Sequence, residues 1–377
     1  MKKLIRSMHF FMGVLVLCAM AKGAAKIGVA PDTTASAIAI VNLDQQIVQA
    51  GSESGVEELL LVRSRYLGDY EALDRASRLS EGRFATVRDL LRRAHTRSAV
   101  HRFSDAMADL AAAEQMGADP KDILLSRASN LVATGHASEV IPALEKYEGQ
   151  NPGYASRGAL ATAYAAVGRL DDADRLYAAA LNDLDTTLPF PYAWIYFARG
   201  LMWSEQSDKL ERAEAMYRQA LAYVPEFVPA NVNLAELEAA RGDAAPAIEH
   251  LEHALHSNDE PEALALLGVL YRHTGRKAEG EHDILLARQR YELLLAGYPL
   301  AFADHAAEYY LGPGADPERA WTLARQNLTN RETDRAVALA IKAAEATGRY
   351  NEACQLLRNH GPYVSLYLRN LERTIPR

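Results

Sequence analysis

The sequence is poor in cysteine and lacks the common catalytic signatures. Its 377 residues include only 2 Cys, too few for a disulfide framework or a four-thiolate zinc site. Neither the phosphate-loop motif G-x4-G-K-[ST] nor the zinc-protease motif H-E-x-x-H occurs. Sustained apolar–polar alternation, which marks half-buried strands, is also missing. These absences argue against a disulfide-rich domain, a P-loop hydrolase and a zinc protease, and they predict an all-α protein.

Positive charge is the scarcer sign. Lys and Arg total 41 against 49 Asp and Glu, so the formal net charge is −8. An acidic chain repels phosphate, and we therefore expect no nucleic-acid partner. The 49% hydrophobic content is that of a folded protein. We find no converging set of acid, base and nucleophile, so we expect neither an enzyme nor a cofactor.

The N-terminus resembles an export signal. It carries basic residues, an apolar run and a small-residue exit in that order: Lys2, Lys3, Arg6, Phe10–Met20, Ala19 and Ala21. These are the parts of a secretory signal peptide, here residues 1–21. The run is shorter than the roughly 20 residues that span a bilayer. We therefore expect cleavage after Ala21, a flexible leader over 22–36, and a periplasmic or secreted protein without stable membrane insertion. An uncleaved membrane anchor is the alternative.

One helical pattern recurs nine times at intervals of 33 to 40 residues. A small residue is followed four positions later by a bulky or apolar one, and usually by a small one after three more. The first members are Ala72, Ala106, Val140, Ala173, Ala213, Ala247, Gly280, Ala320 and Ala353. This spacing places the side chains on one stripe of a helix. A second helical pattern ending in Gly precedes most copies, as in LALLGVLYRHTG at 264–275, and predicts helix–turn–helix units.

The units resemble the tetratricopeptide repeat family, whose period is about 34 residues. The best-matching unit contains Trp194, Phe197, Ala198, Leu201, Ala213, Tyr217, Ala220 and Pro225. The resemblance implies a right-handed α-solenoid of about nine repeats over residues 55–361. An N-terminal capping segment is expected over 37–54 and a C-terminal capping helix over 362–377, because the ends of a solenoid must be shielded.

The resemblance also implies a binding surface. In this family, first-helix residues offset from the packing face line a concave groove. The corresponding residues here are Tyr192, Ile195, Arg199, Met202, Asn233, Glu236 and Arg272. They predict a non-enzymatic scaffold or assembly factor of a bacterial-type cell envelope that binds a protein or peptide. Core packing is the alternative role for the aromatic members.

A histidine-rich helix suggests a second function. It reads AIEHLEHALH, with His250, His253 and His256, and Glu249 could share a metal with His253. A metal-binding or metal-delivery accessory role based on His250 and His253 is thus an alternative, although spacing converges only two ligands and we assign no metal site. The lone Cys354 of the mature chain is expected to be a small buried residue.

Overall fold

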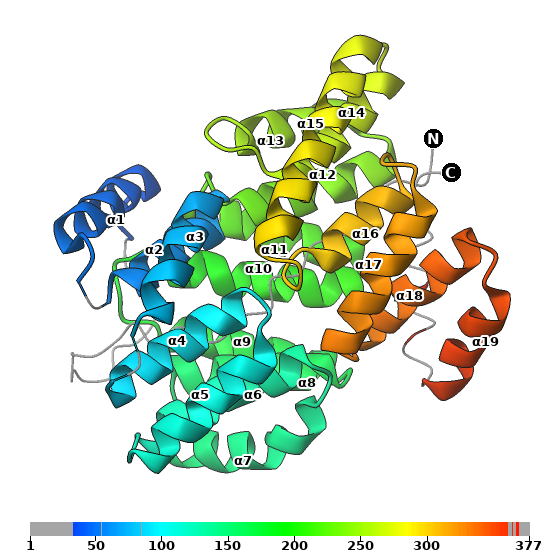
Figure 1. Cartoon of the computed structure of the whole chain (residues 1–377). Helices are drawn as coiled ribbons and strands as arrows, with labels where there is room; N and C mark the ends of the chain where they lie inside the picture. The colour runs from blue at the N-terminus through cyan, green and yellow to red at the C-terminus, as the bar shows by residue number, and fades with distance from the viewer. Residues whose placement is uncertain (1–32, 54, 84, 361–363, 365–366, 369–377) are drawn as a thin grey trace.

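The computed structural model describes residues 33–53, 55–83, 85–360, 364 and 367–368 (Figure 1). The described residues form helices and connecting segments without a strand, which confirms the all-α prediction. The predicted signal peptide, most of the predicted leader and most of the predicted C-terminal capping helix lie outside these residues.

Nineteen helices follow one another along the described chain. They are α1 (Ser36–Ala50), α2 (Val56–Leu67), α3 (Tyr70–Glu81), α4 (Val87–Ala99), α5 (Phe103–Gln115), α6 (Pro120–Ala133), α7 (Ala137–Gln150), α8 (Tyr154–Ala166), α9 (Leu170–Asp183), α10 (Phe190–Glu205), α11 (Leu210–Tyr223), α12 (Val228–Arg241), α13 (Ala244–Ala254), α14 (Pro261–His273), α15 (Lys277–Gly297), α16 (Ala303–Leu311), α17 (Pro317–Asn330), α18 (Asp334–Ala346) and α19 (Tyr350–Asn359).

From α2 to α19 the helices pack as nine consecutive pairs, α2 with α3 through α18 with α19. The stripe that recurs in the sequence holds each pair together. In α11, Ala213, Tyr217 and Ala220 are fully buried. Gly200 of α10 lies against the Tyr217 ring so closely that a Cβ there would overlap it. Small residues thus let the helices approach, and the large residue fills the gap between them.

The solenoid winds back on itself. Turns within the first three pairs meet loops between later pairs: Gly68 meets Asn258, His101 meets Leu300, and Gly135 meets Glu332. We call these three contacts the rungs. Each joins one pair to the junction that leads into the pair six positions further along. One turn of the superhelix therefore takes about six pairs.

Aromatic side chains fill the space between the first rungs. The Tyr66 ring packs against Phe190 and Phe227, with centroids 4.9 and 4.6 Å away. Its hydroxyl donates to the Phe190 carbonyl oxygen at 2.6 Å. Tyr70 meets the edge of Phe302 at 5.2 Å. Buried aromatics contribute much of the apolar area of a core, so the N-terminal pairs belong to the same core as the later ones.

This winding covers the inner helices. Every residue of α12 from Val228 to Glu238 is buried, and α12 contacts α2 as well as its neighbours in the solenoid. In α14 every residue from Pro261 to Tyr271 is buried too. A helix that is buried all round lies inside the protein and presents no face to solvent. The first helices of these pairs therefore do not line an open groove.

Candidate functional site

Five of the seven predicted groove residues lie in the protein interior. Tyr192, Ile195, Met202, Asn233 and Glu236 are each between 2 and 4% exposed. The resemblance to the repeat family predicts that they line a concave surface, because an open solenoid would leave that face free. Here the superhelix closes over it, so they form no accessible surface in this structure. Their contact with a partner stays a prediction that requires the N-terminal pairs to move.

Tyr192, in the first turn of α10, has a structural role because it holds the loop between α9 and α10. Its hydroxyl donates to the carbonyl oxygens of Leu184 and Thr186 at 3.3 and 3.2 Å. Its ring stacks on Tyr223 with centroids 5.0 Å apart. Burial raises the pKa of its hydroxyl. These contacts favour the alternative of core packing for this aromatic residue.

The two basic members of the predicted set are more accessible. The Arg199 Nε donates to Asp174 at 2.9 Å, and the Trp203 indole nitrogen donates to the same carboxylate at 3.2 Å. Arg199 is partly buried by this arrangement, whereas Arg272, near the end of α14, is exposed. Arg272 is therefore the predicted residue that a partner can reach without any movement of the chain.

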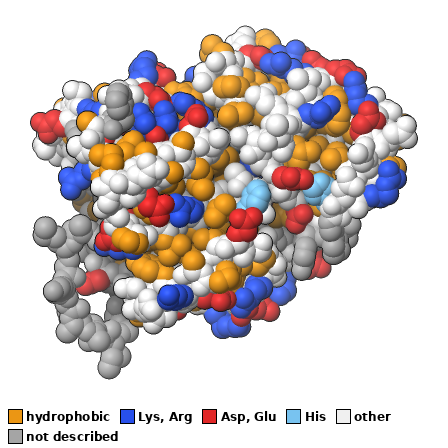
Figure 2. All heavy atoms as spheres, turned by 60° about the horizontal axis from the view of Figure 1, so that its bottom comes forward, with side chains coloured by type: hydrophobic (Ala, Val, Ile, Leu, Met, Phe, Trp, Pro, Cys, Tyr) orange, Lys and Arg blue, Asp and Glu red, His pale blue; other side chains and the backbone are white. Residues whose placement is uncertain are grey.

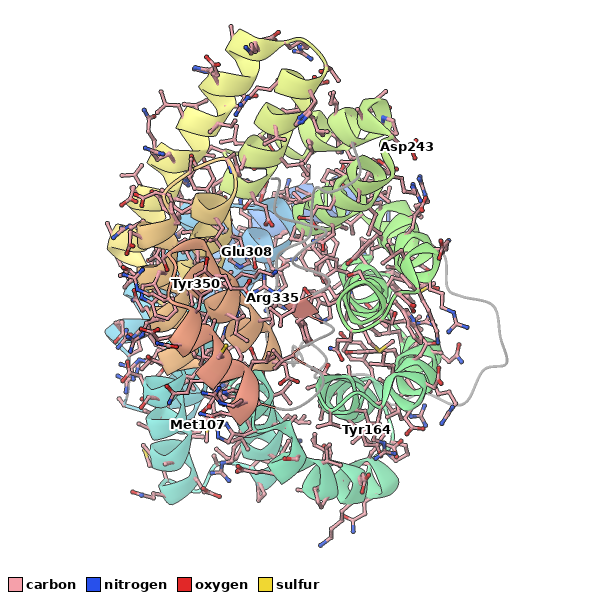
Figure 3. The ribbon with its side chains drawn as sticks, turned by 90° about the vertical axis from the view of Figure 1, so that its right-hand side faces the viewer. Met107, Tyr164, Asp243, Glu308, Arg335 and Tyr350 are labelled. Atoms are coloured by element: carbon pink, nitrogen blue, oxygen red, sulfur yellow. The ribbon has the colours of Figure 1, made fainter. Side chains whose placement is uncertain are left out.

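A polar cavity of about 150 Å³ lies on the inner side of the superhelix, where the third pair meets the last one. Its lining includes Ser138, Glu205, Thr333, Asp334, Arg335 and Tyr367. Arg335 and Glu308 project into the middle of the molecule (Figure 3). Nothing in the sequence pattern indicated this cavity, because it forms between residues about 130 to 230 positions apart.

The arginines beside the cavity are already neutralised. Arg335 donates to Asp304 at 2.8 Å and to Glu308 at 2.7 Å, and its Nε lies 3.8 Å from Glu205. Arg331 also donates to Asp304, which is fully buried. Burial raises the pKa of Asp304, but the positive groups around it lower that pKa by more. The pKa of Asp304 therefore lies well below its usual value.

Carboxylates outnumber guanidinium groups around the cavity. Glu205, Glu332 and Asp334 line it together with Arg331 and Arg335. Burial raises the pKa of Asp334, which indicates a partly desolvated acid. Glu332 is exposed and lies 3.6 Å from His360, whereas Glu205 and Asp334 are half-buried. Carboxylates in such a lining favour cationic or hydrogen-bond-donating ligands.

Side chains from beyond the last helix pair reach this region. Tyr367 lines the cavity, and burial raises the pKa of its hydroxyl well above the usual value, with Glu205 and Asp334 acting in the same direction. Val364 is fully buried in the main core. A capping helix over 362–377 was predicted to shield the end of the solenoid, and side chains directed at the inner side of the superhelix were not part of that prediction.

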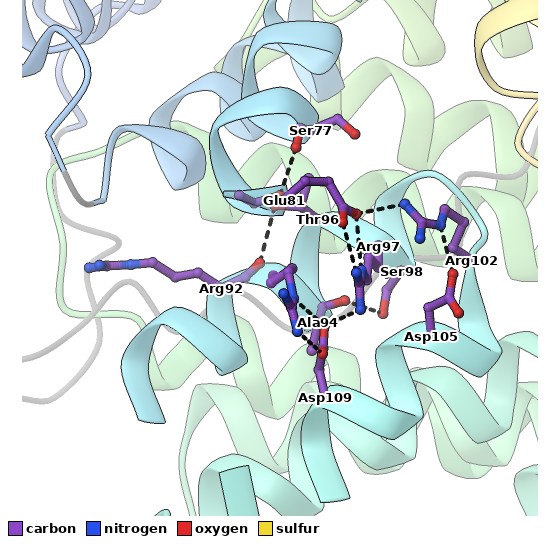
Figure 4. Close-up of polar contacts among 12 residues, drawn as sticks. Ser77, Glu81, Arg92, Ala94, Thr96, Arg97, Ser98, Arg102, Asp105 and Asp109 are labelled. Atoms are coloured by element: carbon purple, nitrogen blue, oxygen red, sulfur yellow. Dashed lines mark hydrogen bonds and ion pairs between the residues drawn. The ribbon is translucent and has the colours of Figure 1, made fainter. Parts of the chain in front are cut away.

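A network of ion pairs ties α3, α4 and α5 together (Figure 4). Arg97 donates to both carboxylate oxygens of Glu81, at 3.0 and 2.7 Å, and to Asp109 at 2.8 Å. Arg93 donates to both oxygens of Asp109, at 3.0 and 2.6 Å. Paired, bidentate arginines orient helices rather than offer free charge to a ligand. This network therefore fixes α3, α4 and α5 relative to each other.

The histidine-rich helix does not assemble a metal site. His250 lies 3.0 Å from the Asn231 side-chain oxygen and faces α12, whereas His253 and His256 are exposed. Burial lowers the pKa of His250. In the part of the chain that the structure describes, no group of three or more His, Cys, Asp or Glu could hold a metal ion. The metal-delivery alternative thus finds no support here.

Two further observations concern the surface. Cys354 is exposed, so the expectation that it is buried is wrong. Ala353 occupies the packing stripe of α19, which turns the next residue outward. None of the helices within the described ranges is long and apolar enough to cross a membrane. The face drawn in Figure 2 mixes acidic and basic side chains among apolar ones.

Comparison with known proteins supports the repeat assignment. Residues 206–280 match the family model described as tetratricopeptide repeat. No curated protein matches the chain. Among solved structures, MamA is 19% identical, with 44% of this chain and 94% of that chain covered and a TM-score of 0.37. The Cut9 and Hcn1 assembly of the APC/C is 16% identical, with coverage of 87% and 66% and a TM-score of 0.48.

A tetratricopeptide repeat protein from Parabacteroides merdae is 14% identical, with 67% of this chain and 93% of that chain covered and a TM-score of 0.39. Likenesses this distant say nothing about partners. The matched segment begins just after α10 and ends in the first turn of α15. It includes α11, the pair α12–α13 and α14. Residues 206–280 thus match the tetratricopeptide repeat family, and they lie within a run of nine helical pairs.

Proposed function

We propose that the protein is a non-enzymatic scaffold of the cell envelope that binds a segment of a partner protein. The tetratricopeptide match within an array of helical pairs is the observation that carries this proposal. Such arrays use the surfaces of their stacked helices for binding. The partner is therefore recognised by shape and charge.

The polar cavity is the binding site we favour. Its excess of carboxylates suits a basic segment. The aromatic side chain of Tyr367 already lies in its lining, which favours an aromatic anchor residue in the partner. The chain itself carries such a segment, because Arg369, Arg373 and Arg377 follow Tyr367 in the sequence. We infer that a partner contributes a peptide of the same character, basic with an aromatic residue, and that it competes with Tyr367.

Peptide binding tests this site. A labelled peptide with the sequence of residues 361–377 is titrated into the full chain and into its Tyr367→Ala variant, and fluorescence anisotropy is recorded. We expect about tenfold tighter binding to the variant, because the internal competitor has been weakened. A peptide with its arginines replaced by glutamates should not bind. Equal affinity of both chains for the two peptides would refute the cavity as the site.

Export is tested separately. If residues 1–21 are a cleaved signal, the chain recovered from the envelope fraction of the source cells begins at Lys22. Recovery of a chain that retains Met1 in the membrane fraction would instead support the anchored scaffold. Neither result depends on the peptide titration.

A further inference from the structure

One buried arginine has no acidic partner. Arg65 of α2, Arg331 and Arg335 are all less than 9% exposed. Arg331 and Arg335 both donate to Asp304, whereas Arg65 forms no ion pair or hydrogen bond with any described residue, and its Nε is buried without a partner. Burial of an unpaired charge is costly. Such a guanidinium is therefore suited to an anion that a ligand supplies.

The surroundings of Arg65 are aromatic. Its guanidinium carbon lies 4.9 Å from the centre of the Trp194 ring of α10, which provides a cation–π contact. Burial lowers the pKa of Arg65, and the hydroxyls of Tyr66 and Tyr154 act in the opposite direction. No carboxylate of the described chain is among the groups that shift this pKa. Trp194 and Tyr154 are half-buried, so solvent reaches the neighbours of the charge.

His95 of α4 lies within range of the same charge. Its Nε2 is buried and has no hydrogen-bond partner among the described residues. Burial, and then the charge of Arg65, lower its pKa to about 3, so His95 is neutral. One positive charge therefore remains, and one carboxylate neutralises it. A phosphate group, with a charge of about −1.5 to −2, would leave excess negative charge in a desolvated place.

One stripe of α10 joins Arg65 to the polar cavity. Trp194, Ala198, Leu201 and Glu205 are spaced by four, three and four residues, which places them on one side of the helix. Trp194 lies beside Arg65, and Glu205 lines the cavity. We call these four residues the α10 track. Its ends are about 16 Å apart at a rise of about 1.5 Å per residue, and its middle is apolar.

The length of the α10 track indicates the spacing of residues in a bound segment. An extended chain advances about 3.3 Å per residue, so the two ends of the track would be met by residues about five positions apart. The C-terminal sequence of the chain has a matching order, with Tyr367, the apolar Leu368 and Leu371, and then Glu372. Glu372 is the sole Asp or Glu among residues 361–377. A peptide of these residues therefore carries groups suited to both ends.

We propose that Arg65 binds a side-chain carboxylate of the partner segment whose aromatic residue occupies the polar cavity. The partner then carries an Asp or Glu about five positions after its aromatic anchor. This inference rests on the peptide site proposed above and adds a second requirement for its ligand. The edge of a guanidinium offers two parallel N–H groups to a carboxylate, so the pair fixes the register of the segment along the α10 track.

Peptide variants test this inference without changing the chain. Labelled peptides of residues 361–377 with an amidated C-terminus, in which Glu372 is the only carboxylate, are titrated into the Tyr367→Ala chain, and fluorescence anisotropy is recorded. Glu372→Gln should weaken binding at least about tenfold, because Arg65 loses its partner in a desolvated place. A peptide that combines Glu372→Gln with Asn370→Glu keeps the net charge but moves the carboxylate. It should bind as weakly as the Glu372→Gln peptide.

A matching change in the chain completes a double-mutant cycle. With Arg65→Met added to Tyr367→Ala, the parent and Glu372→Gln peptides should bind equally. Arg88→Met, which removes an exposed arginine of α4, should preserve the difference between them. Thermal unfolding shows that each chain is folded, and Arg65→Met should not lower the Tm, because the charge that it removes is unpaired.

The outcomes separate this inference from the proposed function. Binding that is indifferent to Glu372, or to the position of the carboxylate, overturns the contact with Arg65 and leaves the cavity as the peptide site. An effect of Glu372 that persists in the Arg65→Met chain does the same. Failure of the parent peptide to bind the Tyr367→Ala chain overturns both.

Discussion

His101 and Leu300 lie 199 residues apart in the sequence, yet the His101 Nδ1 is 3.2 Å from the Leu300 carbonyl oxygen. His101 occupies a left-handed turn with a φ of 57°. In six other pairs the corresponding turn contains a glycine with positive φ. A bulkier residue in this conformation carries a steric cost. The bond to Leu300, and another that Asn330 donates to the His101 carbonyl oxygen at 3.0 Å, offset that cost.

The buried histidines should make the protein sensitive to acid. Burial lowers the pKa of His95 and of His101 to about 3. Both are neutral in the folded chain, while in the unfolded chain they take up a proton below about pH 6.5. Their stabilisation is complete above that pH and is lost as the pH falls towards 3. His101→Asn should therefore reduce the slope of Tm against pH between 6.5 and 4, measured by differential scanning calorimetry. A slope equal to that of the wild type would contradict the buried, neutral state of His101.

The third rung can be broken by adding one methyl group. A Cβ at Gly135 would overlap the Glu332 carbonyl oxygen, whereas one at Gly242 would meet nothing within 4 Å. The two glycines have φ of 90° and 92°, so alanine costs about 1 kcal/mol of backbone strain at either position. We expect Gly135→Ala to lower the free energy of unfolding by about 1–3 kcal/mol more than Gly242→Ala. Urea denaturation of both variants measures the difference, and equal losses would mean that the rung contributes nothing.

Glu260 should make stability fall towards alkaline pH. Burial, above all, raises its pKa to about 7, although it caps α14 and accepts a hydrogen bond from Tyr70 at 3.0 Å. Because the folded-state pKa is the higher one, its stabilisation is complete below about pH 4.5 and is lost as the pH rises through 7. Glu260→Gln should thus gain stability over the wild type between pH 5 and 8, by up to about 3 kcal/mol at the upper end.

The neighbours of Glu260 act on the same balance. Asp259 adds negative charge beside it, whereas a backbone hydrogen bond from Glu262 lowers its pKa. Arg290 of α15 lies near Tyr70 and forms an ion pair with Asp259 at 3.1 Å. Thermal unfolding of the wild type and of Glu260→Gln in a single buffer series isolates the contribution of Glu260 to the pH dependence of stability. Parallel curves for the two chains would show that Glu260 does not titrate in this range.

Among the charged residues beside the cavity, Asp304 should be the one whose neutralisation costs the most stability. Asp304→Asn leaves Arg331 and Arg335 buried with less compensating charge, which costs about 3–5 kcal/mol. Asp172→Asn removes a partner of Arg169 at the surface and should cost less than about 1 kcal/mol. Chemical denaturation of the two variants gives the comparison. Similar losses would mean that solvent reaches Asp304.

The sequence predicted the local structure well and the winding poorly. The stripe of Ala213, Tyr217 and Ala220 predicts a helix and its packing face, because both depend on residues a few positions apart. The burial of Tyr192 depends partly on the loop between α9 and α10, and the cover over α12 depends on α2, which lies more than 160 residues earlier. Repeat spacing carries no information on superhelical pitch, so an open groove was predicted where the chain packs on itself.

The rungs also limit how such a chain can change in length. In an open array, a repeat can be duplicated or lost anywhere, because each one contacts only its neighbours. Here Gly68, His101 and Gly135 each meet a loop that lies a fixed number of pairs ahead. Duplication of one central pair, such as α8–α9, would shift all three partners by one place at once. The central repeats are therefore fixed in number, and growth or loss is tolerated only towards the two ends.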